Sequence, residues 1–121
     1  MITRSTNMEN GTIWFIKQIS GVLVFLVIII HIVVNHLVAE TGLLNYADVV
    51  RYFANPWIAF MESSFLILVI CHSLLGLRSV ILDFKPSTGF MKTVDPILIL
   101  IAVIASGYGM WLTVTVGSVV L

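Results

Sequence analysis

Three long apolar runs dominate the chain, and two short links between them carry most of the polar residues. Each run exceeds the roughly 18 to 20 residues that a helix needs to cross the hydrocarbon layer of a bilayer. The strict alternation of a membrane β-barrel is absent from stretches such as LVFLVIII. We therefore expect an all-α membrane protein with three transmembrane helices, over about residues 13–38, 57–82 and 94–119.

The first link, over residues 39–56, contains GLLNYADVVRYF, which predicts about one turn of helix at the membrane surface. Tyr46, Tyr52 and Trp57 would lie near the lipid headgroups, where aromatic rings with a polar tip are favoured. Neither this link nor the second is long enough to hold a soluble domain. Residues 1–121 are therefore expected to form a single transmembrane domain.

The second link, over residues 83–95, holds the helix-breaking residues Pro86 and Gly89. At its end Asp95 is followed directly by Pro96. An aspartate N-cap and a proline in the first helical position both suit the unpaired N–H groups at a helix start. The sequence therefore predicts that the third helix begins at this pair.

Composition agrees with a membrane setting and excludes several classes of function. Hydrophobic residues make up 60% of the chain and charged residues 10%, which is far from the composition of soluble domains. The net charge of zero indicates no surface for nucleic acid. Cys71 is the only cysteine, so no internal disulfide and no covalent C-x-x-C-H haem attachment can form. The first apolar run is too long for a signal peptide and is expected to stay attached.

Basic residues are distributed unequally between the two sides of the membrane. Arg51 lies in the first link, whereas the others lie before or early in the first helix or around the second link: Arg4, Lys17, Arg78, Lys85 and Lys92. The positive-inside rule then places the N-terminus in the cytoplasm and the C-terminus outside. Three helices do not readily enclose a site alone, so we expect a partner subunit that joins this chain in a larger bundle, multi-pass in the cell (inner or plasma) membrane.

Five side chains within the apolar runs are costly in lipid: His31, Asn35, His36, Glu62 and His72. His72 is followed one turn later by Gly76, and Ser79 and Asp83 continue the same stripe. Neutral imidazole is a common axial ligand of haem iron, and a glycine one turn away leaves space for the flat macrocycle. A histidine that hydrogen-bonds across a helix interface explains the pattern about equally well.

The helix rise and antiparallel neighbours put His31 and His72 about 10 Å apart in depth, too far to share one iron. They would serve two different haems, and each iron would need a second ligand from a companion bundle. His36 points to a different face from His31, so the two do not form a single-face metal pair. At a depth similar to that of Glu62, His36 could pair with this carboxylate or relay a proton, although contact with headgroups and water also explains it.

Three segments, in this order, resemble the membrane-anchor subunits of succinate dehydrogenase and fumarate reductase. K-Q-I-S-G-V (17–22) is similar to the entry into the first helix of that family. H-I-V-V-N (31–35) resembles the motif around the outer haem ligand of two-haem anchors. H-x-x-x-G-L-R-x-x-x-x-D-F (72–84) is similar to the motif around the inner ligand. The resemblance covers roughly the first 85 residues and is closer to the second, or D-type, anchor.

The resemblance implies that His72 is an axial ligand of the inner haem b and His31 of the outer haem b, with His36 as the fallback for the outer one. The other residues expected near these groups are Gly76, Ser79 and Asn35 for the haems, and Ser20 and Asp83 for quinone. Two haems are implied, each shared with a second membrane-anchor subunit. The further partners are an iron–sulfur subunit, a flavoprotein subunit, membrane lipid and quinone.

Three positions depart from the family pattern. Gln18 stands where the family usually has an arginine that serves a haem propionate or quinone, and Trp14 where one anchor type has a quinone-binding serine. Phe84 follows Asp83 where the family has a tyrosine whose hydroxyl can bind quinone. We therefore expect the quinone pocket to lie mainly in partner subunits.

The expected function is electron transfer between the iron–sulfur subunit and quinone, with the dicarboxylate chemistry in partner subunits and this chain as a non-catalytic anchor. One rival is a small transporter or channel subunit in which Glu62 and the histidines carry protons or cations. The absence of a carboxylate near the bilayer midplane argues against it. A structural assembly factor, or the anchor of another bis-histidine cytochrome b oxidoreductase, such as a formate dehydrogenase or hydrogenase, are further alternatives.

Overall fold

The structure is a computed structural model that describes residues 10–38 and 45–119, and nearly all of these residues are helical. The elements in chain order are α1 (Gly11–Ile32), the π-helix η1 (Val33–Val38), α2 (Tyr46–Ala54), α3 (Pro56–Asp83) and α4 (Thr88–Gly117). Three segments are long and apolar enough to cross a membrane: Gly11–Leu37, Pro56–Asp83 and Thr88–Gly117. The expectation of three transmembrane helices is confirmed.

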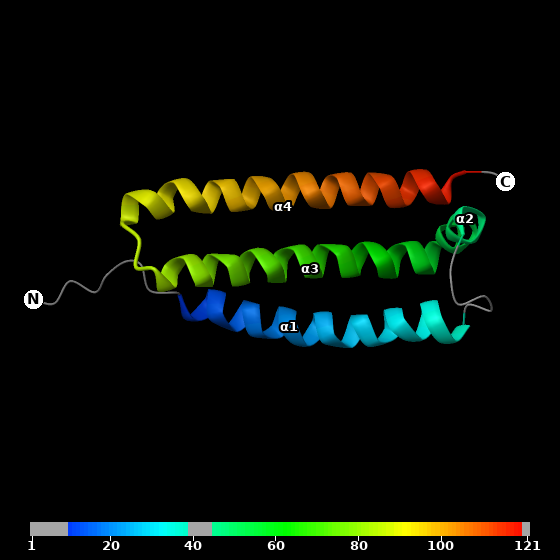
Figure 1. Cartoon of the computed structure of the whole chain (residues 1–121), viewed down its shortest axis with the longest axis horizontal. Coiled ribbons are helices and arrows are strands. Elements are labelled where there is room, and N and C mark those ends of the chain that lie inside the picture. The colour runs from blue at the N-terminus through cyan, green and yellow to red at the C-terminus, as the bar shows by residue number, and fades with distance from the viewer. Residues whose placement is uncertain (1–9, 39–44, 120–121) are drawn as a thin grey trace, which may run out of the picture.

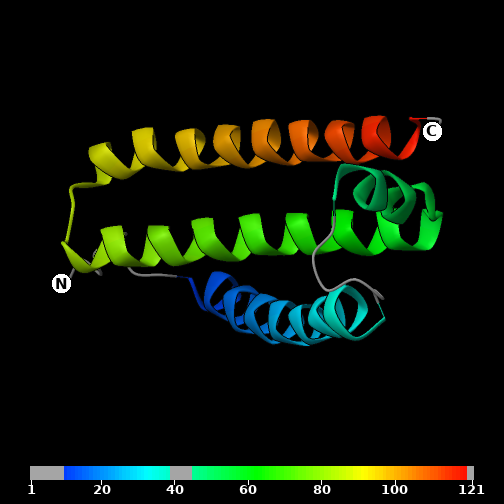
Figure 2. The same cartoon turned by 45° about the vertical axis from the view of Figure 1, so that its right-hand side comes forward.

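The three long helices run side by side, with α3 in the middle (Figure 1). In the described part of the chain, α1 and α4 each pack against α3 and do not pack against each other. The turned view shows α2 crossing one end of the bundle, where it packs against α3 and α4 (Figure 2). The bundle is therefore an open, layered arrangement whose two outer helices each leave a broad face uncovered.

The first link contains a longer helix than the single turn expected from the sequence. α2 has nine residues, and its start is fixed by a capping box. The Asn45 side chain accepts a hydrogen bond from the backbone N–H of Asp48, whose carboxylate accepts from the N–H of Asn45. Val50 anchors the helix on the bundle and is only 2% exposed. Tyr52 of this helix thereby comes within hydrogen-bond distance of Glu62 of α3.

The predicted start of the third helix at Asp95 is wrong, because α4 begins at Thr88. Ser87 is the N-cap, and its hydroxyl accepts a hydrogen bond from the N–H of Phe90 at 3.2 Å. Gly89 lies inside the helix and does not break it. The N-cap motif of Ser87 therefore precedes the Asp-Pro pair and starts the helix first.

Asp95 and Pro96 serve the helix interior instead of its start. Pro96 lies inside α4, where it removes one backbone hydrogen bond, as transmembrane helices often tolerate. The Asp95 carboxylate accepts from Arg78 of α3, with 2.8 Å between Nε and Oδ1. A tertiary ion pair thus takes the carboxylate that the sequence pattern assigned to capping.

Basic side chains gather at one end of the bundle, which we call the basic end: Lys17, Arg78, Lys85 and Lys92. This end holds the start of α1 and the turn between α3 and α4 (Figure 1). Arg51 of α2 lies at the opposite end. Arg4, which also entered the prediction of orientation, lies outside the described residues.

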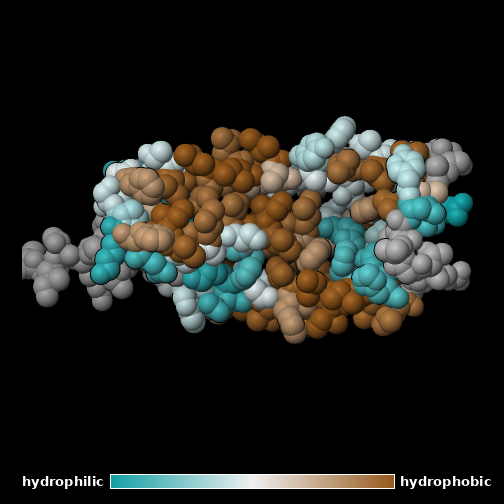
Figure 3. All heavy atoms as spheres, in the orientation of Figure 1, coloured by the Kyte–Doolittle hydropathy of each residue, from teal (hydrophilic) through white to brown (hydrophobic). Residues whose placement is uncertain are grey.

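The face of the bundle seen in Figure 3 is largely apolar between its two ends. Among the described residues only Ser20, Val50 and Met91 are buried. Large side chains such as Phe25 and Ile99 of the spans are more than 60% exposed. Lipid is the natural solvent for such a surface, because hydrocarbon does not penalise exposed apolar side chains. Hydrophilic patches interrupt it toward both ends of the bundle.

Candidate functional site

Two polar layers connect α1 with α3, and each contains one histidine. In the layer nearer the basic end, the Ser20 hydroxyl donates to the carbonyl of Lys17 at 2.8 Å. A hydroxyl has one hydrogen, so Ser20 Oγ acts as the acceptor for Nδ1–H of His72, 3.0 Å away. This arrangement favours the tautomer of His72 with the proton on Nδ1. The lone pair of Nε2, which has no hydrogen-bond partner in the described part of the chain, is left for a ligand.

A groove of about 540 Å³ lies beside this histidine, between α1 and α3. Its lining residues are Lys17, Gln18, Gly21, Val22, Phe25, His72, Gly76 and Ser79. A Cβ added to Gly76 would meet no atom within 4 Å, so the space one turn from His72 is open. Three of the residues expected at the inner haem, His72, Gly76 and Ser79, therefore line one groove. Imidazole, open space and apolar walls fit a haem.

A positive charge lies at the polar end of the groove, although the family's arginine is replaced by Gln18. The Lys17 ammonium, one position earlier, donates to the Ser79 hydroxyl at 2.8 Å. Ser79 in turn donates to the carbonyl of Leu75. Sequence reasoning used Lys17 for the membrane orientation and as part of the entry motif, and missed its place in the groove. The basic residue of that motif was the signal that could have found it.

The close approach of α1 to His72 depends on Gly21, which sequence reasoning did not single out. A Cβ at Gly21 would lie 3.0 Å from Cε1 of His72. This distance is tighter than ordinary van der Waals contact. The Ser-Gly pair of the entry motif therefore has two functions here, since Ser20 bonds the imidazole and Gly21 leaves room for it.

The second layer lies at the far end and is centred on Glu62 of α3. Nδ1 of His31 lies 2.9 Å from Oε1 and 3.0 Å from Oε2 of this carboxylate. Tyr52 of α2 donates its hydroxyl hydrogen to Oε1 of Glu62. Of the two interpretations of His36, pairing with Glu62 is not found, because His31 has this place. The exposed His36 side chain agrees with the other one, contact with headgroups and water. Spacing along one helix did not show which histidine faces α3.

Asn35 completes the outer layer from the π-helix. Its amide donates to the carbonyl of His31 at 2.9 Å and to the Tyr52 hydroxyl oxygen at 3.2 Å. A side chain bonded to the carbonyl four residues back competes with the regular helix ladder, which accounts for the π-helical turns at this point. Asn35 thus contacts the backbone of His31 and reaches its imidazole only through Tyr52 and Glu62.

The Tyr52 hydroxyl is a hydrogen donor at all ordinary pH values. Its partial burial raises the pKa of the phenol well above the usual value, and the hydrogen bond to Glu62 and the negative charge of that carboxylate raise it further. The phenol therefore stays protonated. Its hydrogen remains on the carboxylate while the oxygen accepts from Asn35.

The two layers lie at clearly separate depths. His72 is level with Ser20, and His31 follows Ser20 by eleven residues of α1, or about 16 Å of helix rise. This separation is larger than the 10 Å expected from the sequence, because the actual register of α1 against α3 is offset. Residues 21–30 between the layers, GVLVFLVIII, carry no polar side chain. The layers are thus two sites, with apolar helix between them.

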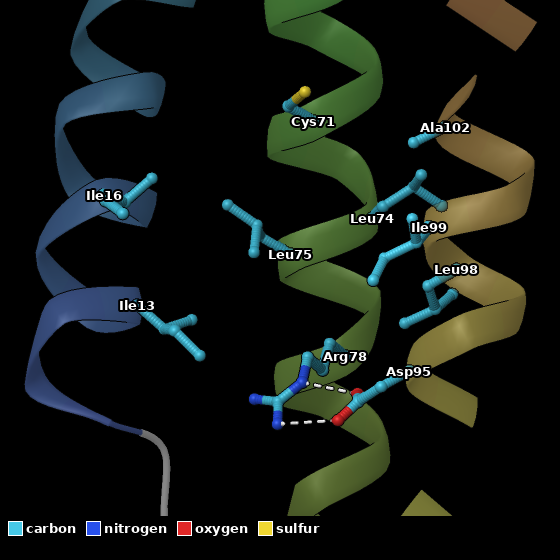
Figure 4. Close-up of a pocket in the computed structure, with 10 residues that line it drawn as sticks. All are labelled: Ile13, Ile16, Cys71, Leu74, Leu75, Arg78, Asp95, Leu98, Ile99 and Ala102. Carbon is cyan, nitrogen blue, oxygen red and sulfur yellow. Dashed lines mark hydrogen bonds and ion pairs between the residues drawn. The ribbon is translucent and has the colours of Figure 1, made fainter. Parts of the chain in front are cut away.

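A second hollow of about 430 Å³ lies between α1, α3 and α4 (Figure 4). Its walls are mostly aliphatic, and the Arg78–Asp95 pair closes one end. Cys71 lines it as a small apolar residue. Asp83, expected near quinone, lies exposed at the last turn of α3 and does not line this hollow.

Fold and site together define a class: a helical membrane subunit with three spans and two histidine layers. The chain belongs to the succinate dehydrogenase/fumarate reductase transmembrane subunit family, whose family model matches residues 3–109. It is similar to the succinate dehydrogenase hydrophobic membrane anchor subunit of Archaeoglobus fulgidus, with 29% identity over 99 residues that cover 82% of this chain and 84% of the relative. No solved structure gives a significant match. The chain is therefore an integral, multi-pass membrane anchor subunit of a dehydrogenase or reductase complex.

Proposed function

We propose that this anchor subunit binds haem b and passes electrons between an iron–sulfur subunit and membrane quinone. A bound b-type haem supplies a one-electron carrier. The observation that carries the proposal is the groove that His72 lines, because Nδ1 of this histidine is bonded to Ser20 and the space one turn away at Gly76 is open. Family membership supports the same role, because the family consists of transmembrane subunits of redox enzymes.

Each residue of the inner groove has a distinct part in this proposal. His72 would hold the haem iron through Nε2, and Ser20 would orient its ring through Nδ1. Gly76 leaves space for the macrocycle. The Lys17 ammonium, held by Ser79, binds a propionate carboxylate.

The outer layer holds the second haem in the same proposal, with His31 as its ligand. Nδ1 of His31 points at Glu62, so Nε2 carries the lone pair here as well. The depth difference of about 16 Å supports two haems and not one shared between the histidines. Each layer offers one imidazole, so a second membrane-anchor subunit would supply the other ligand for each haem.

Quinone contact with this chain is the smaller part of the proposal. Ser20 was expected near quinone, but it is 7% exposed and its hydroxyl is used by Lys17 and His72. This favours orientation of His72 over contact with quinone. Asp83 remains the candidate on this chain, and partner subunits form most of the pocket.

The transporter hypothesis is less well supported. A path for protons or cations needs polar groups or water across the bilayer. The described spans place ten residues without polar side chains, 21–30, between the two layers on α1. On α3 the stretch FLILVI, residues 65–70, separates Glu62 from His72 in the same way. Electron transfer through haems needs no such path.

The ligand assignment is tested by His72→Ala in the assembled complex, with His36→Ala as the matched control. Removal of His72 is expected to abolish the inner haem and about half of the reduced-minus-oxidised b-type absorbance, because the iron loses an axial ligand. His36 is exposed and outside both layers, so its variant is expected to keep the full spectrum. Unchanged absorbance in His72→Ala, with the complex intact, would contradict the proposal.

A further inference from the structure

The carboxylate of Glu62 is unusual for a membrane-spanning helix, because its side chain is only 11% exposed. Burial of a carboxylate within a span is costly unless partners compensate it. Glu62 has two partners from different elements, Nδ1 of His31 on α1 and the hydroxyl of Tyr52 on α2. Both donate to a group that can only accept. The carboxylate thus has defined donors on two sides.

We propose that Glu62, held by Tyr52, is a positioning residue for His31 that directs Nε2 toward the outer haem iron and lowers the reduction potential of that haem. The inference rests on the proposed function, since it requires His31 to be a haem ligand. It goes further in assigning roles to Glu62 and Tyr52, which lie on other helices than the ligand.

The physical argument begins with the hydrogen bond on the far side of the ring. A carboxylate that accepts Nδ1–H fixes the ring orientation and the proton position, and it makes Nε2 a stronger electron donor. A stronger donor and a nearby negative charge both favour ferric over ferrous iron. The reduction potential of the haem therefore falls. The inner histidine differs, because its Nδ1 donates to the neutral hydroxyl of Ser20.

The position of Tyr52 depends on the packing of α2. The capping box fixes the start of this helix. At its other end the carbonyl of Phe53 lies so close to α4 that a Cβ at Gly117 would be 2.5 Å from it. Asn35 donates to the phenol oxygen, which leaves the phenol hydrogen for Glu62. His31 of α1, Tyr52 of α2 and Asn35 of η1 therefore act together to orient the Glu62 carboxylate.

The ring of His31 is also restrained on its face. It stacks on Phe65 of α3, with 5.2 Å between ring centroids and 30° between the planes. Phe65 follows Glu62 by three residues, so both lie on the same side of α3. Edge and face contacts together leave the imidazole little freedom. A ligand that must keep one orientation toward iron requires this restraint.

The experiment is a redox titration of the intact complex at fixed pH, followed by haem absorbance, for Glu62→Gln. The amide keeps the shape and an acceptor oxygen but removes the charge. Both haems are expected to remain, the midpoint potential of the outer haem is expected to rise, and the g-values of its ferric low-spin signal to change. The inner haem is expected to be unaffected. Ser64→Ala, whose hydroxyl bonds only the carbonyl of Phe60 in its own helix, is the matched control.

A second variant covers the case in which Glu62→Gln loses the outer haem. Tyr52→Phe removes one donor to the carboxylate and leaves the His31–Glu62 contact in place. A shift of the outer potential in this variant supports the inference. An unchanged potential and ferric signal, in whichever variant retains both haems, contradicts it while the proposed function stands. Retention of the outer haem in His31→Ala would contradict the proposed ligand itself.

Discussion

The hydroxyl of Ser20 shows how a single side chain sets the chemistry available to a histidine. Its hydrogen belongs to the Lys17 carbonyl, so its oxygen can only accept from His72. This arrangement favours the tautomer with the proton on Nδ1, which leaves the lone pair on Nε2. At the outer layer Glu62 has the same effect on His31, with a charge added.

At this scale we predict that Ser20→Ala weakens the inner haem site. The variant leaves Nδ1–H of His72 without its acceptor and frees the ring to turn. Loss of such a supporting hydrogen bond typically lowers affinity about 10- to 100-fold. The haem-to-protein ratio of the purified complex, and the rate of haem transfer to apomyoglobin, measure the effect. Haem retention equal to that of Ser64→Ala would rule this role out.

Among the elements, the short helix α2 determines where Tyr52 lies in the outer layer. It is short and lies outside the spans, yet it packs on α3 and α4 and brings Tyr52 to Glu62. Its contact with α4 is close at Gly117, which faces the backbone of Phe53. Backbone cannot move aside as the end of a flexible side chain can. The distance between α2 and α4 therefore requires a residue without a side chain at this position.

We predict that Gly117→Ala lowers the stability of the complex and displaces α2. The added methyl group would lie 2.5 Å from the Phe53 carbonyl oxygen, and overpacking of this kind typically costs about 1–3 kcal/mol. Gly107→Ala is the control, because a Cβ there meets no atom within 4 Å in the described structure. Thermal unfolding of the detergent-solubilised complex compares the two. Equal midpoints for both variants would show that the contact is not required.

For the whole molecule, the unequal distribution of basic residues between its two ends predicts its orientation in the membrane. The basic end collects Lys17, Arg78, Lys85 and Lys92, and Arg51 lies at the other end. The uncovered apolar faces of the spans suit lipid, and the positive-inside rule predicts that the basic end lies on the cytoplasmic side. In the proposed function, this orientation would place the inner histidine layer nearer the soluble subunits than the outer one.

This orientation predicts a labelling pattern for two introduced cysteines in a Cys71→Ser background. Tyr46 and Phe84 lie at opposite ends and are 69% and 81% exposed. A membrane-impermeant maleimide is expected to label Tyr46→Cys in intact cells, because α2 lies outside. Phe84→Cys is expected to react only after the membrane is opened. The reverse pattern would place the N-terminus outside and contradict the predicted orientation.

The sequence by itself determined the number of spans, the polar residues within them and the family. Transfer of a segment into lipid depends on the summed hydrophobicity of that segment, which is a local property. The motifs around His31 and His72 are local as well. A scan of 121 residues could therefore find them without knowledge of neighbouring helices.

Only the tertiary structure decided which side chains meet. The offset of α1 against α3 gave Glu62 to His31 and not to His36, and put Ser20 on His72. The tertiary structure likewise paired Asp95, which lies inside α4, with Arg78 of α3. Helix register depends on how side chains of distant segments fit together, and lipid as solvent does not favour one offset through hydrophobicity. Packing and hydrogen bonds between helices set it, and these do not follow from the pattern along one segment.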